Sequence, residues 1–104
     1  MTELAAVSAA ADAIEAAMRE VGMWSDTPPE PAAYEFQMAF AMDTMAFSQW
    51  LQFVFLPRVR ELVAAGGPLP SQSQVAAQAV REWDGYHEAG PVLDALHAFD
   101  ALFD

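Results

Sequence analysis

Hydrophobic residues in the first twenty-one positions recur at steps of three and four. They are Leu4, Val7, Ala11, Ile14, Met18 and Val21. This spacing keeps the side chains on one face of an α-helix. Gly22 follows directly and predicts the end of that helix, because glycine readily adopts the left-handed conformation that closes helices. Two heptads are too few for a coiled coil, so we expect this face to pack into the domain's own core.

The next segment changes character at a group of prolines. The sequence SDTPPEP, residues 25–31, predicts an extended connection, since three prolines within four positions prevent a regular helix. Trp24 precedes it, and this side chain either packs into the core or folds over it as a lid. A helical but uneven pattern runs from Ala32 to Met45. Its methionine-rich face is either core or an adaptable binding surface.

The stretch FSQWLQFVFLPRV, residues 47–59, is apolar in nearly every direction when placed on a helix. Gln49 and Gln52 form its only polar sector. A helix of this kind is buried or shared with a partner, and we expect it at the centre of the fold. Pro57 lacks the N–H that would bond to the carbonyl of Phe53, and its ring would clash there. The helix should therefore kink at Pro57, or end and restart there.

The C-terminal half reads as three further helical stretches. Residues 58–64 are amphipathic, and this helix should end at Gly66-Gly67-Pro68. Ser71 and Gln74 have the spacing of a capping box, which predicts the start of a fourth helix. Pro91 suits the first turn of a last helix. The expected inward faces are Ala76, Ala79, Val80 and Trp83, with His87 as a further candidate, then Val92, Leu96, Phe99 and Phe103. Asp94, Asp100 and Asp104 are expected on the outer face of the last helix. The predicted fold is an all-α single domain over residues 1–104. It is a bundle of four to five helices with a central aromatic-rich helix kinked or broken at Pro57.

Charge narrows the classes of partner. Fifteen acidic residues face four arginines, giving a formal net charge of -11. Such a chain repels phosphate backbones and anionic lipid, so we expect no direct nucleic-acid binding and no membrane association. A protein partner with a basic face fits better, although acidity also serves solubility alone. The chain has no cysteine, no signal-peptide pattern and no apolar run long enough to span a bilayer, which indicates a cytoplasmic protein.

Motifs for chemistry are missing. His87 and His97 are the only histidines, without the spacing of a metal-binding motif, and no serine has a recognisable base. We therefore expect no enzyme activity, no catalytic residues, no metal and no cofactor.

Interaction and pocket candidates come from the aromatic centre and its flanks. An inter-helix pocket is one interpretation of part of this set, and a well-packed aromatic core is the stronger one. For the arginines after Pro57, a clamp on a carboxylate such as Asp43 or a nearby glutamate outweighs an anion site. The candidates are Trp24, Met42, Asp43, Trp50, Phe53, Phe55 and Arg58.

The stretch MDTMAFSQWLQFVFLPRVREL, followed by GGPLP, resembles the YqcC-like family of small bacterial proteins. Trp24 after the first helix and the closing AFDALFD extend the likeness over nearly the whole chain. The resemblance implies an all-helical bundle and supplies no catalytic residues. Family members are often encoded beside a tRNA pseudouridine synthase or joined to one. This implies a partner by association only.

Two functions from different classes remain. The first is a non-catalytic helical module that binds another protein, with a tRNA pseudouridine synthase as the suggested partner and a homodimer as a further possibility. The second is a binder of a small hydrophobic ligand in an inter-helix pocket.

Overall fold

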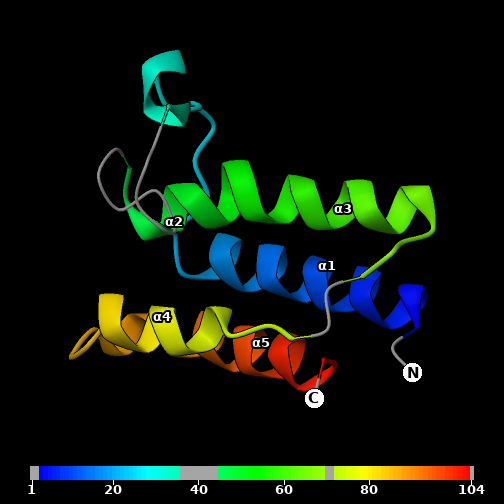
Figure 1. The fold of residues 1–104 in the computed structure, drawn as a ribbon. Helices are drawn as coiled ribbons and strands as arrows, with labels where there is room; N and C mark the ends of the chain where they lie inside the picture. The colour runs from blue at the N-terminus through cyan, green and yellow to red at the C-terminus, as the bar shows by residue number, and fades with distance from the viewer. Residues whose placement is uncertain (1–2, 36–44, 70–71, 104) are drawn as a thin grey trace.

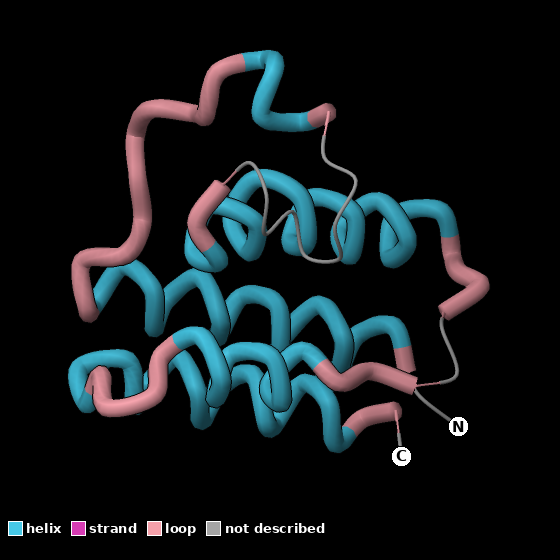
Figure 2. The backbone as a smooth tube through the Cα atoms, turned by 60° about the vertical axis from the view of Figure 1, so that its left-hand side comes forward, coloured by secondary structure: helices cyan, strands magenta, loops and turns pink. Residues whose placement is uncertain are grey.

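The computed structural model describes residues 3–35, 45–69 and 72–103. All the secondary-structure elements within these ranges are helices, which confirms the predicted all-α class. Helix α1 (Leu4–Glu20) lies between two layers, as Figures 1 and 2 show. It packs against α3 (Leu56–Ala65) on one side and against α5 (Gly90–Ala101) on the other, and α4 (Val75–Glu82) packs on α5.

Helix α1 forms where its periodicity predicts. Val7, Ala11, Ile14 and Met18 are all fully buried on one face. The backbone turns out of the helix at Gly22, where φ is +78°. The Met23 N–H donates to the Met18 carbonyl at 2.8 Å, which is the bond expected when a glycine closes a helix in this way.

The proline-rich connection after α1 arches away from the helical layers (Figure 2). It ends in η1, a single 3₁₀ turn spanning Pro31–Tyr34, and Glu35 already leaves helical geometry. The predicted helix beginning at Ala32 is therefore a 3₁₀ turn over residues 32–34 and is wrong for Glu35. The bond from the Glu35 N–H to the Ala32 carbonyl closes the tighter turn. Residues 36–44 lie outside the described part of the chain.

The aromatic-rich stretch forms one uninterrupted helical path made of three pieces. Helix α2 (Phe47–Trp50) passes into a π turn, η3 (Leu51–Phe55), and then into α3. The Leu56 N–H donates to the Leu51 carbonyl, five residues back. Pro57 follows in the first turn of α3. The kink or restart predicted at Pro57 thus corresponds to the change from a π turn to an α-helix just before it. A π turn before a proline is physically reasonable, because proline cannot make the regular α-helical bond.

Helix α3 ends as predicted at Gly66, where φ is +81°. The predicted start of α4 is wrong, because residues 72–74 are not helical and α4 begins at Val75. Asp100 of α5 explains this start. Its carboxylate accepts bonds from the Val75 N–H at 3.2 Å, the Ala76 N–H at 2.8 Å and the Ser73 hydroxyl. Helix α4 is thus capped by a distant residue.

The last helix has the predicted inward face. Pro91 lies in its first turn, and Val92, Leu96, Phe99 and Phe103 are all buried. The short 3₁₀ turn η4 (His87–Ala89) precedes it. Val80 is 47% exposed, so its predicted inward position on α4 is wrong. Val75, with Ala76 and Ala79, forms the buried face of α4 instead.

Candidate functional site

A line of aromatic rings crosses the molecule from α4 to the end of α5. The ring centroids of Phe47 and Trp50 are 5.7 Å apart, and those of Trp50 and Phe55 are 5.3 Å apart; both pairs are stacked. The line continues at each end through ring contacts between Phe47 and Trp83, Phe55 and Phe99, and Phe99 and Phe103. Phe47, Phe99 and Phe103 are buried, whereas Trp50 and Phe55 are only partly buried. This ring line joins the two layers that flank α1.

Trp24 packs against the hydrophobic core and is partly buried. The Arg19 guanidinium lies 4.7 Å from the centre of its indole. This cation–π contact covers one face of the ring. Trp24 thus belongs to the packing around the first helix.

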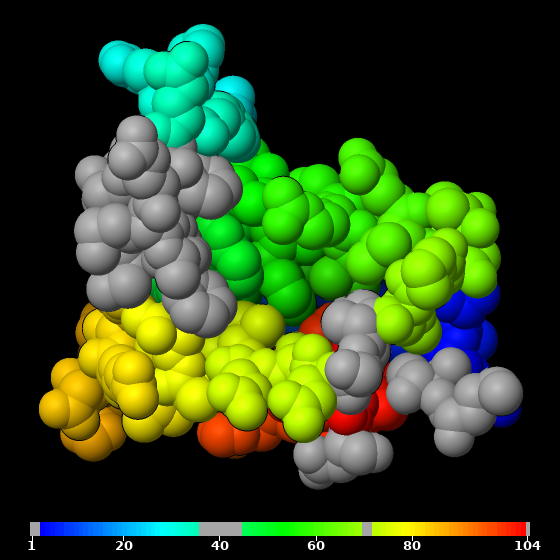
Figure 3. All heavy atoms as spheres, in the orientation of Figure 1, coloured from blue at the N-terminus to red at the C-terminus, as the bar shows by residue number. Residues whose placement is uncertain are grey.

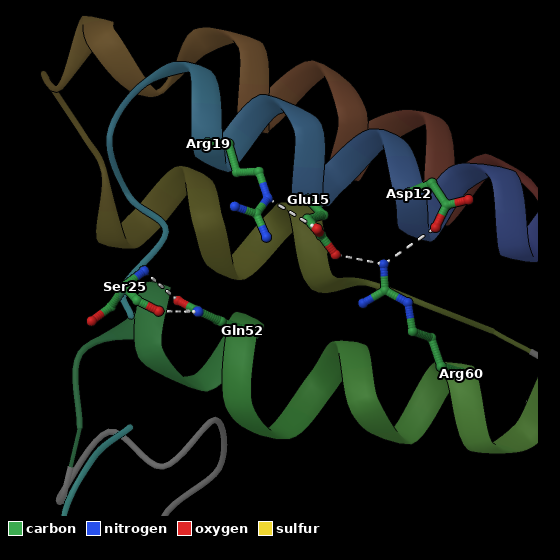
Figure 4. Close-up of polar contacts among 6 residues, drawn as sticks. All are labelled: Asp12, Glu15, Arg19, Ser25, Gln52 and Arg60. Atoms are coloured by element: carbon green, nitrogen blue, oxygen red, sulfur yellow. Dashed lines mark hydrogen bonds and ion pairs between the residues drawn. The ribbon is translucent and has the colours of Figure 1, made fainter. Parts of the chain in front are cut away.

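Gln52 explains how the segment after Trp24 is held (Figure 4). Its side-chain oxygen accepts from the Ser25 N–H at 2.9 Å, and its amide nitrogen donates to the Ser25 carbonyl at 2.6 Å. Gln52 is 7% exposed and is the buried polar side chain among the described residues. These two hydrogen bonds satisfy both the N–H and the carbonyl of Ser25, as a neighbouring β-strand would.

Replacing Gln52 by methionine is expected to lower the free energy of unfolding by about 1–2 kcal/mol. Methionine keeps most of the volume but leaves the Ser25 N–H and carbonyl without their partner. Chemical denaturation of the variant measures the loss. The matched control is Gln49→Met, because within the described residues Gln49 accepts a single bond, from the Ala46 N–H at the exposed start of the same helix. Equal losses in the two variants would contradict the assigned role of Gln52.

Arg60 forms the carboxylate clamp that the sequence suggested for this region (Figure 4). Its guanidinium contacts Glu15 at 2.9 Å and Asp12 at 3.3 Å, both from α1. Glu15 also binds Arg19 at 3.0 Å. Asp12 is exposed, and Arg60 and Glu15 are only partly buried, so the contacts orient α3 on α1 and add little stability. Arg58 is exposed and makes no ion pair within the described residues, and Asp43 lies outside them.

An apolar hollow of about 280 Å³ lies where α3, α5 and the segment leading into α4 meet. Two of the predicted candidates line it, Phe55 and Arg58. Its other walls come from Val7, Val59, Leu62, Leu69, Gln72, Ser73, Gln74, Val75, Phe99 and Phe103. Trp24, Trp50 and Phe53 do not line this hollow, and Met42 lies outside the described residues. The structure thus divides the described candidates: Trp50 lies in the ring line, Arg58 lines the hollow and Phe55 belongs to both. Trp24 and Phe53 line neither of them.

The described side chains offer no assembled metal centre. No group of three or more histidine, aspartate or glutamate residues is close enough there to hold an ion. His87 and His97 are both exposed, on η4 and α5. None of the helices in the described ranges has the length and apolar character needed to cross a membrane.

Two structurally important residues escaped the sequence reading. Ser25 carries its role in its backbone, which no side-chain pattern reveals. Asp100 was predicted to face outward, but it is partly buried and caps α4. Its sequence signal is weak, because an aspartate on an amphipathic helix is normally solvated.

Known proteins resemble this chain over most of its length. The model of the DUF446 family, described as tRNA pseudouridine synthase C, matches residues 6–102. The chain belongs to the DUF446 family. This agrees with the resemblance to YqcC-like proteins seen in the sequence. The solution NMR structure of YqcC from Escherichia coli has a TM-score of 0.86 and 33% identity, and the match covers 99% of this chain and 89% of that one.

Relatives in the DUF446 family differ in length. YqcC from E. coli K12 is 35% identical over 92 residues, which cover 88% of this chain and 84% of the relative. An uncharacterized protein from Haemophilus influenzae is 28% identical over 89 residues, covering 86% and 84%. A tRNA pseudouridine synthase C from Pectobacterium carotovorum is 38% identical over 72 residues, which make up 69% of this chain but 19% of that protein.

Proposed function

We propose that this chain is a non-catalytic module that binds another protein, and that its partner is a tRNA pseudouridine synthase. The match to the Pectobacterium synthase carries the proposal, because it covers 69% of this chain and only 19% of the longer protein. A sequence like this one therefore forms part of a chain named as a synthase. When two units belong to one chain, the connection keeps them at a high effective concentration. Two separate chains must instead associate through a binding surface.

The charge of the molecule supports a protein partner. A net charge of -11 opposes binding to the phosphates of tRNA. An RNA-modifying enzyme must itself present a basic face to its substrate, and an acidic chain is complementary to such a surface. Charge complementarity of this kind accelerates association and weakens as salt is added.

The test uses the purified chain and the tRNA pseudouridine synthase from the same organism. Isothermal titration calorimetry at low and at physiological salt is expected to show a saturable complex whose affinity falls with salt. The chain alone, incubated with tRNA, is expected to form no pseudouridine. A lack of heat at both salt concentrations would refute the partner. Pseudouridine formed by the isolated chain would refute the non-catalytic role. Native mass spectrometry of the chain alone tests the homodimer.

The apolar hollow favours a second candidate function, the binding of a small hydrophobic ligand. An engineered cavity of 150 Å³ holds benzene, so a hollow of about 280 Å³ has room for on the order of ten non-hydrogen atoms. Arg58 in its lining would favour a ligand that carries a carboxylate.

Decanoate is a suitable probe of this second function, with decanol as its uncharged counterpart. NMR titration is expected to shift resonances of Val59 and Phe99, which line the hollow. Arg58→Gln should weaken the binding of decanoate but leave the affinity for decanol unchanged. If neither probe gives a saturable shift below millimolar concentration, the hollow is not a ligand site.

A further inference from the structure

The connection between α4 and α5 lies at one end of the molecule (Figures 1 and 3). Apolar side chains of this connection and of α4 are exposed there. Three large hydrophobic residues are exposed within the described ranges, and two of them, Val80 and Tyr86, lie here at 47% each. Together with the partly buried Trp83 and Leu93 they line a hollow of about 270 Å³. We call this the tip surface. Exposed aromatic surface of this kind is typical of binding sites.

The tip surface is held in shape by the fold beneath it. The Trp83 ring meets Phe47 edge to face, with centroids 5.3 Å apart, so one part of the indole is fixed to the ring line. The Tyr86 N–H donates to the Trp83 carbonyl at 2.9 Å, and the Tyr86 carbonyl accepts from the Ala89 N–H at 3.2 Å. Gly85, with φ of +79°, permits the tight turn between the two aromatic residues. A preformed surface loses little entropy when it binds.

Charge around the tip surface selects the kind of partner. Asp84 lines the hollow itself, and Glu82, Glu88 and Asp94 are exposed on the flanking elements. No ion pair engages Asp84, Glu88 or Asp94 within the described part of the chain. Against these four acids stand Arg81 and His87. A second copy of the chain would bring acid against acid, so self-association through this surface is disfavoured.

We propose that the tip surface, centred on Tyr86, Trp83 and Asp84, docks an arginine-bearing segment of a protein partner. A guanidinium stacks on aromatic faces and pairs with carboxylates through its planar fork, which lysine does less well. Tyrosine, tryptophan and arginine are also the residues that dominate binding energy at protein interfaces. The proposal rests on the proposed function, because it names the surface through which that complex forms.

Titration calorimetry of paired variants tests the surface, with the full chain and the purified tRNA pseudouridine synthase. Tyr86→Ala is expected to weaken the complex about 10- to 30-fold, the range of an interface hot spot. The matched control is Tyr34→Ala, because Tyr34 is 42% exposed and lies on η1 at a different part of the molecule. This control should change the affinity less than about twofold.

Charge reversal provides an independent measurement. Asp84→Arg should weaken the complex by a similar factor and flatten its dependence on salt, whereas Asp26→Arg on the exposed connection after α1 should do neither. Unchanged circular dichroism and Tm in all four variants confirm that the fold is retained. Equal losses at positions 34 and 86, or no loss at 84, would overturn the proposal.

A photoreactive phenylalanine analogue at position 86, or at 34 as control, separates this proposal from the proposed function. In the native cell, a cross-link from position 86 to an arginine-bearing segment of the synthase supports both. A cross-link to the synthase from position 34 alone overturns the tip surface and leaves the proposed function standing. A cross-link from 86 to an arginine-bearing segment of an unrelated protein supports the tip surface and refutes the synthase as partner.

Discussion

Replacing Leu51 by alanine is expected to lower the free energy of unfolding by about 3 kcal/mol, within the range measured for buried leucines. Leu51 is fully buried in the π turn of the aromatic-rich helix. Truncation removes apolar contacts and leaves a cavity that the helices on either side cannot easily fill. Urea denaturation followed by circular dichroism measures the change in midpoint and slope.

The matched control is Leu62→Ala, because Leu62 lies on the following helix α3 and is only partly buried. Its side chain lines the apolar hollow, so part of its surface faces open space already. The expected loss is about 1 kcal/mol, since less apolar area returns to water. Comparable losses at the two positions would show that the π turn does not point Leu51 into the core.

Replacing Asp100 by alanine is expected to cost about 2 kcal/mol, since it removes a charged helix cap. The variant leaves the Val75 and Ala76 N–H groups and the Ser73 hydroxyl without their acceptor. It also removes a negative charge from the positive end of α4. Hydrogen exchange of the first turn of α4, together with urea denaturation, measures both the local and the global effect.

Asp94→Ala is the control for Asp100, because Asp94 lies on the same helix and is exposed. It should change stability by less than about 0.5 kcal/mol, as surface substitutions usually do. Protection of the Val75 and Ala76 amides should fall in the Asp100 variant and stay unchanged in the control. Unaltered protection in both variants would mean that the cap contributes nothing to α4.

Helices that bury one face were predictable from the sequence. Val7, Ile14 and Met18 of α1, like Leu96 and Phe99 of α5, occupy their expected inward positions because helical periodicity is a local property. Gly22 and Gly66 were equally clear, since the left-handed conformation strongly favours glycine. Helix faces and helix ends are predictable because they depend on residues close together in the sequence.

Contacts between distant residues were the harder part. The start of α4 depends on Asp100, 25 residues after Val75, and no spacing within the α4 sequence reveals that. The same holds for Gln52 and Ser25, which are 27 residues apart. An arginine clamp was foreseen, but its partners Asp12 and Glu15 belong to the first helix, which no pattern placed beside Arg60.

The candidate site shows the same limit. Phe55 and Arg58 do line an apolar hollow, but its other walls come from α1, α5 and the segment before α4. The tip surface was not predicted, because Val80 and Trp83 fit the helical pattern of a core face equally well. Only the position of α4 against α5 decides which of these side chains reach water.

The π turn fixes the register between the two halves of the aromatic-rich helix. Leu51 and Leu56 are five positions apart and both fully buried. In a regular α-helix, with 3.6 residues per turn, they would point about 140° apart. The wider turn acts as a one-residue insertion that brings them into phase. Deleting a residue within Leu51–Phe55 would rotate the part carrying Phe47 by about 100° relative to the part carrying Arg60, so chain length here is as constrained as composition.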